Sequence, residues 1–244
     1  MNQYFRFELR RLIRDPRLML FAVITPVISY VVFSGVAAQT NDPAFNRELA
    51  TTLMIGMACY GAVFGALGVG VSVSLERTNG WLRQLRATPL KPARVIVVRA
   101  VLSTLTAIPP VVAVGLAGWI QHGITLPAGR WASLVVLLWL GTIPFALLGL
   151  AIGYGLSPQV AQPVSFLSFF ALSVLGGLLV PVTAFPVLLQ KLANALPTYR
   201  YAELGWRAAD GVWPGAGGVA VLAGWGVLFA ALAGYTYRRF AAVR

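Results

Sequence analysis

Six long stretches without a single Asp, Glu, Lys or Arg constrain this 244-residue sequence more than any other feature. Each is close to the roughly 20 apolar residues that a helix needs to cross a bilayer. Backbone groups find no water inside a bilayer, so a chain of this kind folds there as helices that satisfy their own hydrogen bonds. The stretches cover residues 18–38, 50–75, 100–120, 131–156, 163–181 and 217–237.

The composition excludes most water-soluble classes of protein. Only 11% of the residues are charged, against roughly 25% in an ordinary soluble domain. A soluble fold of this size could not cover its surface with polar groups, which argues against soluble enzymes, nucleic-acid-binding domains and disordered proteins. The connections leave no room for a soluble domain of roughly 100 residues. We therefore expect residues 1–244 to form one all-α integral membrane domain with six transmembrane helices.

The basic residues predict which side of the membrane each connection occupies. The net charge is +12. Fourteen of the 19 Lys and Arg residues fall in residues 1–17, residues 76–99 and the C-terminus. Cytoplasmic loops carry an excess of Lys and Arg, so these segments and both termini are expected in the cytoplasm of a prokaryotic cell. Anionic lipid headgroups explain the positive charge better than nucleic acid does.

Two segments outside the six stretches predict helices that do not span. Residues 1–17 place apolar side chains on one helical face and Arg6, Arg10 and Arg14 on another, as in an amphipathic helix at the membrane interface. The alternative is a signal peptide cleaved after residues 36–38, which the further apolar stretches disfavour. Residues 182–216 hold an apolar segment too short to cross a bilayer, expected outside the cytoplasm as re-entrant or interfacial short helices. Their aromatic residues suit the headgroup region: Tyr199, Tyr201, Trp206 and Trp213.

Prolines and glycines within the stretches predict local geometry. Pro109 and Pro110 predict a kink in the third span, and Pro144 lies inside the fourth. The GxxxG pairs Gly61/Gly65 and Gly149/Gly153 allow close approach of neighbouring helices.

The sequence lacks the groups that would make the chain an enzyme or an autonomous pump. It contains no GxxxxGK[ST] phosphate loop, so it cannot hydrolyse ATP by that route. Cys59 is the only cysteine and His122 the only histidine, which excludes an internal disulfide and zinc sites built on several cysteines. All acidic residues fall outside the six stretches, whereas ion-coupled carriers often place a carboxylate at mid-membrane depth. We expect no catalytic residue, metal or cofactor in this chain, and an energy source in a partner.

The connection at residues 76–99 carries the most distinctive local pattern, E-R-x-x-G-x-L-x-x-L-x-x-T-P-L. Trp81, Leu82 and Leu85 share one face of a short helix, and Pro89 ends it. A short amphipathic helix presented to the cytoplasm can dock on a soluble partner. The alternative is an amphipathic loop resting on lipid headgroups.

This pattern, the length and the topology together resemble the type-2 ATP-binding-cassette exporter permeases. The resemblance implies two permease subunits, here expected as a homodimer, and separate cytoplasmic ATPase subunits that bind ATP and Mg²⁺. In that family a further acidic residue usually stands near the glycine, where this chain has Thr78, Asn79 and Trp81. The residues that the resemblance assigns to coupling with the ATPase are Glu76 and Arg77 as anchors, Gly80 at the turn, Trp81, Leu82 and Leu85 on the docking face, and Thr88 and Pro89 at the helix end.

The resemblance also implies a cargo path along the second and fifth spans, and short extracellular helices near residues 182–213 that gate exit. The residues expected along the path are Met57, Tyr60, Phe64, Phe166, Phe169 and Phe170. Uncharged aromatic walls suit a hydrophobic or amphiphilic small molecule of the drug or antibiotic type. The alternatives are simple packing of these aromatics, export of a lipid-linked polysaccharide or other envelope component, and a membrane sensor or structural subunit without transport. The lack of polar residues in the spans disfavours an intramembrane enzyme.

Overall fold

The computed structural model describes residues 16–37, 42–78 and 92–242, and this part of the chain is helical, without a strand. Five of its helical segments are long and apolar enough to cross a membrane, and Leu20–Val36 is a shorter apolar helix. The elements are α2 (Pro16–Ala37), α3 (Pro43–Thr78), α5 (Pro92–Leu105), α6 (Ile108–His122), α7 (Ala128–Gly141), α8 (Ile143–Gly155), α9 (Pro158–Leu175), η1 (Val182–Ala184), α10 (Val187–Ala195), α11 (Pro197–Asp210) and α12 (Ala216–Ala242).

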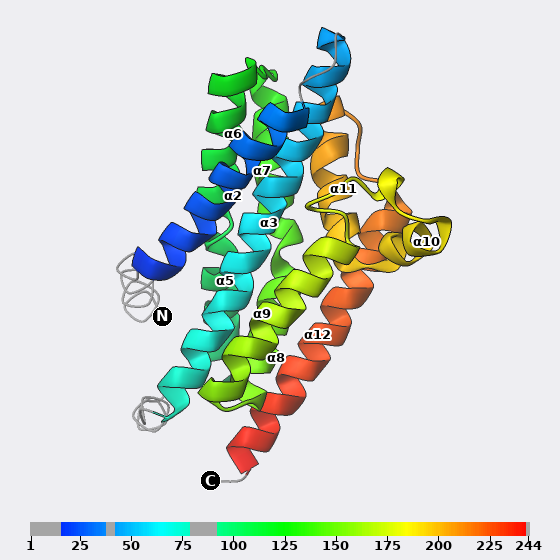
Figure 1. Ribbon diagram of the computed structural model, residues 1–244. Helices are drawn as coiled ribbons and strands as arrows, with labels where there is room; N and C mark the ends of the chain where they lie inside the picture. The colour runs from blue at the N-terminus through cyan, green and yellow to red at the C-terminus, as the bar shows by residue number, and fades with distance from the viewer. Residues whose placement is uncertain (1–15, 38–41, 79–91, 243–244) are drawn as a thin grey trace.

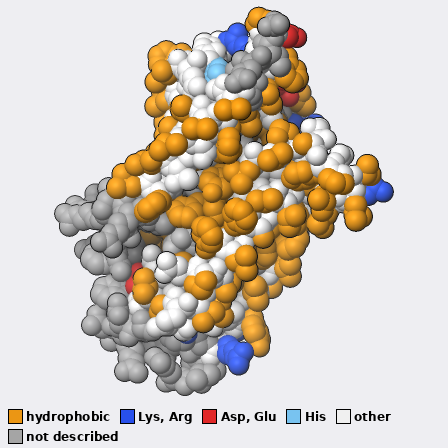
Figure 2. Space-filling view, viewed as in Figure 1, with side chains coloured by type: hydrophobic (Ala, Val, Ile, Leu, Met, Phe, Trp, Pro, Cys, Tyr) orange, Lys and Arg blue, Asp and Glu red, His pale blue; other side chains and the backbone are white. Residues whose placement is uncertain are grey.

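The long helix α3 lies at the centre of the bundle, in contact with α2, α6, α8 and α9 (Figure 1). The end of α3, the turn between α8 and α9 and the end of α12 lie at one end of the bundle. The start of α3 and the connection between α6 and α7 lie at the other end. We call these the α3-end and the α3-start of the bundle. Hydrophobic side chains cover most of the visible face between them (Figure 2), as expected for a surface in contact with lipid.

Helix α3 is longer than the apolar stretch that predicted it. The second apolar stretch starts at residue 50, but α3 already begins at Pro43, so the polar residues directly before the stretch are helical and do not form a loop. Asp42 Oδ1 accepts hydrogen bonds from the backbone N–H groups of Ala44 (2.9 Å) and Phe45 (3.3 Å), and Pro43 suits the first helical position. At its other end α3 continues to Thr78, and α5 begins at Pro92, so both ends of the predicted connection 76–99 are helical.

The third and fourth spans are each interrupted by a break between two helices. The third span divides into α5 and α6, with Pro109 and Pro110 in the first turn of α6. The fourth divides at Thr142, with Pro144 starting α8. The Thr106 and Thr142 hydroxyls donate to the carbonyls of Ser103 (2.6 Å) and Trp139 (2.5 Å), which satisfies backbone groups freed at the breaks.

The fifth span is shifted towards the N-terminus, since α9 starts at Pro158 and ends at Leu175 rather than running over 163–181.

The glycine pairs bring α3 close to two different neighbours. A Cβ added to Gly70 would overlap the carbonyl of Gly149, and one on Gly153 would overlap the carbonyl of Gly70, so α3 and α8 cross at backbone contact. A Cβ on Gly61 would lie 2.6 Å from the carbonyl oxygen of Ala22 in α2. The glycines therefore fix α3 between α8 and α2.

Residues 182–216 form the short helices η1, α10 and α11, none long enough to span. Helix α10 exposes Leu188 and Leu192, whereas α11 packs on α7, α3 and α12. The headgroup position expected for Tyr201 is wrong: the side chain is fully buried and its hydroxyl donates to the Leu138 carbonyl (2.9 Å). Burial raises the pKa of Tyr201 well above its ordinary value, so the hydroxyl stays protonated as a donor. Trp213 is 87% exposed, in keeping with an interfacial position.

Candidate functional site

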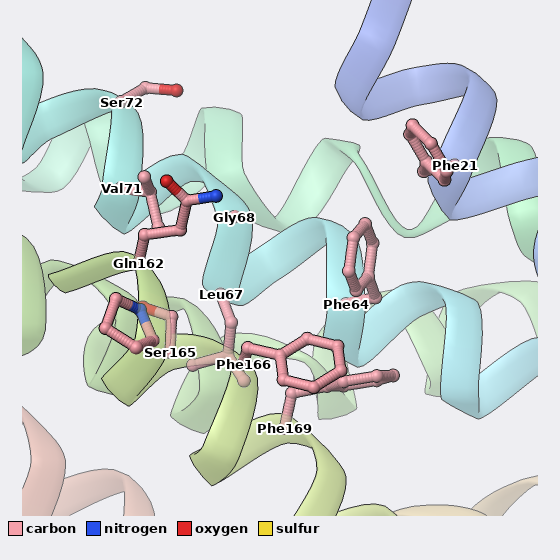
Figure 3. Close-up of a pocket in the computed structure, with 11 residues that line it drawn as sticks. Phe21, Phe64, Leu67, Gly68, Val71, Ser72, Gln162, Ser165, Phe166 and Phe169 are labelled. Carbon is pink, nitrogen blue, oxygen red and sulfur yellow. The ribbon is translucent and has the colours of Figure 1, made fainter. Parts of the chain in front are cut away.

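A cavity of about 600 Å³ lies between α2, α3 and α9 and opens to the side of the bundle (Figure 3). We call it the lateral groove. Its lining comes from one face of α3, one face of α9 and a single aromatic residue of α2. The lining residues are Phe21, Phe64, Leu67, Gly68, Val71, Ser72, Gln162, Pro163, Ser165, Phe166 and Phe169.

Aromatic rings form one end of the lateral groove. The Phe169 ring lies 5.2 Å from that of Phe64 and 4.6 Å from that of Tyr60, measured between centroids. Phe166 lies beside Phe169, with centroids 6.4 Å apart, and Phe21 of α2 faces the groove beyond Phe64 (Figure 3). Edge-to-face and tilted contacts of this kind stabilise an aromatic wall. This end of the groove can accept an apolar or aromatic group.

Uncharged polar side chains form the other end, nearer the α3-end of the bundle. Ser72 of α3 and Gln162 of α9 line this part of the groove (Figure 3). Ser165 is only 5% exposed, and within the described chain its hydroxyl has no hydrogen-bond partner. A buried polar group without a partner is costly, which makes this hydroxyl a ready contact for a ligand. Because no charged residue is among the described residues that line the groove, it suits an uncharged hydrogen-bonding group here.

Three of the six residues predicted for the cargo path line the groove: Phe64, Phe166 and Phe169. Tyr60 packs behind Phe169, and Phe170 stacks on Phe166 at 6.4 Å while remaining half-exposed. Met57 is completely buried inside the bundle and is not among the lining residues. A role for these residues in transport stays a prediction.

The sequence interpretation missed Phe21, Ser72, Gln162 and Ser165 as lining residues. A signal for three of them is present in the sequence. Ser72 lies eight residues after Phe64 on α3, and Gln162 and Ser165 lie seven and four residues before Phe169 on α9. Spacings of four, seven and eight place residues on one helical face. Nothing in the sequence indicates that α2 contributes Phe21.

A second set of contacts joins the helices at the α3-end. Arg99 of α5 forms an ion pair with Glu76 of α3, and the two side chains are 4% and 7% exposed. Arg77 Nη1 donates to the carbonyl oxygens of Gly153 (2.9 Å), Tyr154 (2.5 Å) and Leu156 (3.1 Å). These carbonyls end α8, where a cation is favoured by the helix dipole and by unsatisfied acceptors. We call the contacts of Glu76 and Arg77 the α3 latch.

The α3 latch lies directly before the segment predicted to dock on an ATPase. Glu76 and Arg77, expected to anchor the helix end by ionic contacts, hold it to α5 and to the end of α8. The remaining predicted coupling residues lie outside the described residues: Gly80, Trp81, Leu82, Leu85, Thr88 and Pro89. Their role stays a prediction.

Comparison with known proteins decides the family. Residues 2–204 match the family described as ABC-2 type transporter. The chain belongs to the ABC-2 type transporter family. It is also 25% identical over 238 residues to a Bacillus subtilis (strain 168) protein named "Putative transport permease YvfS", an alignment that covers 97% of this chain and 96% of the relative.

Membership of the ABC-2 family makes the chain a membrane permease subunit of an ABC transporter rather than its ATPase. Such a permease works with an ABC ATPase partner in general. The several apolar helices agree with a multi-pass membrane protein. The lateral groove and the α3 latch are therefore features of a permease.

Proposed function

We propose that this ABC-2 permease exports hydrophobic or amphiphilic small molecules, and that the lateral groove receives the cargo. In the proposal the chain spans the membrane six times with α2 as the first span, pairs as a homodimer and has both termini in the cytoplasm of a prokaryotic cell. ATP and Mg²⁺ bind to the partner ATPase. The observation that carries the proposal is the laterally open groove between α3 and α9, the second and fifth spans, whose described lining carries no charge.

The division of the groove supports an amphiphilic cargo in one orientation. The polar end with Ser72, Gln162 and Ser165 lies towards the α3-end, so in the proposed topology the aromatic end would lie nearer the membrane centre. The α3-end would face the cytoplasm in the proposed topology. An amphiphile in the inner leaflet could enter sideways with its polar group towards the cytoplasm. Since the part of the lining that the structure describes carries no charge, a neutral hydrogen-bonding head group fits better than a phosphate or a carboxylate.

The α3 latch supports a way of transmitting force from the ATPase to the groove. Residues 79–91 follow α3 directly, so a push on them acts first on its last turn. Arg77 connects that turn to Gly153, Tyr154 and Leu156, directly before α9 begins at Pro158. Both walls of the groove would then move in response to a single push. Glu76 keeps α5 attached to the same point.

A reconstituted complex tests the proposal. The chain is co-purified with its ABC ATPase and placed in liposomes, and ATP-driven movement of a fluorescent neutral amphiphile is followed. We expect transport, and we expect Leu85→Asp to abolish it together with stimulation of the ATPase while the protein still inserts. Val227→Ala, on a 71% exposed site of α12, is the matched control.

Two results would contradict the proposal. Full coupling of the Leu85→Asp complex would refute the docking role of this segment. Transport of a lipid-linked polysaccharide with no movement of the amphiphile would support the alternative cargo instead.

A further inference from the structure

A second cavity, of about 430 Å³, lies at the α3-start of the bundle, away from the lateral groove. The first turns of α3, the segment around η1 and one face of α11 enclose it. Its polar and aromatic lining consists of Glu48, Thr52, Thr183, Tyr199, Trp206 and Phe45. Among the described residues, Glu48 is the one charged residue that lines it, whereas none with a charge lines the lateral groove, so the chemistry of the two cavities differs.

Two rings of α11 form an aromatic wall of the second cavity. The rings of Tyr199 and Trp206 meet edge to face, with centroids 5.8 Å apart and planes at 64°. Trp206 Nε1 donates to the carbonyl oxygen of Thr52 at 3.2 Å, which fixes the indole against α3. The Arg200 guanidinium carbon lies 5.6 Å from the centroid of Tyr199, so this ring already accepts a cation. The wall is rigid and electron-rich.

The carboxylate of Glu48 is not neutralised by the cations around it. Arg47 turns to the carbonyl of Gly123 (2.7 Å), and Arg200 and Arg207 both pair with Glu203. Within the described chain no Lys, Arg or His nitrogen lies within ion-pair distance of Glu48, and the side chain is exposed. A negative charge therefore stands next to an aromatic wall in a cavity large enough for a small organic molecule.

We propose that the second cavity binds an organic cation, a quaternary or protonated amine, with its charge near Glu48 and its alkyl groups against Tyr199 and Trp206. Aromatic faces attract such cations through their quadrupoles. A metal ion is disfavoured because the described residues hold no group of three His, Cys, Asp or Glu side chains that could ligate one. This is a claim about binding by the permease itself, so it holds or fails separately from the proposed export.

The second cavity and the lateral groove are both lined by helix α3. Residues 45, 48, 49 and 52 of α3 line the second cavity, and residues 64, 67, 68, 71 and 72 line the groove. Along α3 the two sets are separated by Gly56 and Tyr60, and at 3.6 residues per turn they lie on different faces of the helix, about 120° apart. Between them Tyr60 packs on Phe169, and Gly56 lies against the carbonyl of Leu178. The second cavity is thus a separate site, on a different face of α3 from the lateral groove.

Calorimetric titration of the purified full chain in a neutral detergent tests the proposal. Choline is the probe, and 3,3-dimethylbutan-1-ol is its uncharged counterpart of the same shape. We expect choline to bind and the alcohol to bind far more weakly. Glu48→Gln should weaken choline binding by roughly fivefold, the upper range for one ionic contact near a protein surface. Tyr199→Leu should weaken it as well, and Asp210→Asn, an exposed carboxylate outside the cavity, should leave it unchanged.

Three outcomes would overturn the proposal: no binding of choline, equal binding of choline and the alcohol, or unchanged choline binding in Glu48→Gln. Each variant is first compared with the parent chain by gel filtration and thermal unfolding. If Tyr199→Leu does not fold, Tyr199→Phe replaces it and should keep binding, because it retains the ring. Loss of binding in both Asp210→Asn and Glu48→Gln would show a general surface effect and also refute the site.

Discussion

Breaking the ion pair between Glu76 and Arg99 should measurably destabilise the chain. In Glu76→Gln the guanidinium of Arg99, which is 4% exposed, would lose its carboxylate partner while staying buried. Removing one member of a buried pair typically costs about 3–5 kcal/mol. For a chain of this length that corresponds to a fall in the melting temperature of roughly 6–20 °C. Thermal unfolding in detergent, followed by gel filtration with fluorescence detection, measures it.

A double variant separates the loss of the pair from the loss of packing. Replacing both charges, as in Glu76→Gln with Arg99→Met, also removes the buried cation that has lost this carboxylate and should recover a large part of the stability. Glu203→Gln is the matched control, because that carboxylate and the two arginines it pairs with are partly exposed, so the loss should be at most about 1 kcal/mol. Two results would refute the reasoning from burial. One is a Glu76→Gln chain that is no less stable than Glu203→Gln. The other is a double variant that loses more stability than the sum of the losses in Glu76→Gln and Arg99→Met.

Two further predictions concern the contacts of α3. Gly70→Val should prevent correct packing of α3 on α8 and lower the yield of folded protein. Gly234→Val should be tolerated, because a Cβ added there meets nothing within 4 Å. Equal yields of the two variants in a detergent-solubilised preparation would contradict the close crossing. Arg77→Lys keeps the charge, but an ammonium group cannot donate to the three carbonyls as the guanidinium does. We therefore expect the amount of cargo moved per ATP hydrolysed to fall more than the rate of ATP hydrolysis. An unchanged ratio in proteoliposomes would refute the role of the α3 latch in transmission.

Much of the fold follows from the sequence because long uncharged stretches have few alternatives. The stretches predict where helices cross, and Pro109 and Pro144 lie at the two breaks that the structure contains. The start of α3 was missed although its signal was present, since Asp42 followed by Pro43 is a favourable helix start. Hydropathy outweighed this local capping signal in the interpretation of the sequence.

The lateral groove was only partly predictable. In a membrane bundle, residues that face lipid and residues that face other helices are equally apolar, so periodicity does not tell them apart. This is why Met57 was expected along the path although it is buried, and why Phe21 was not expected there. The contact of Arg77 with the end of α8 joins residues 76 to 79 positions apart, and no local pattern indicates it.

Blocking the lateral groove tests most directly whether cargo passes through it. Cys59, the only native cysteine, is completely buried, so a cysteine at the groove residue Ser72 can be labelled selectively. Ser72→Cys chains reconstituted with the ATPase are treated with a membrane-permeant maleimide, with Ser133→Cys on α7 as the matched control. We predict that the amphiphile slows labelling at residue 72 only and that labelling there stops ATP-driven transport. Undiminished transport by fully labelled Ser72→Cys chains would contradict the account.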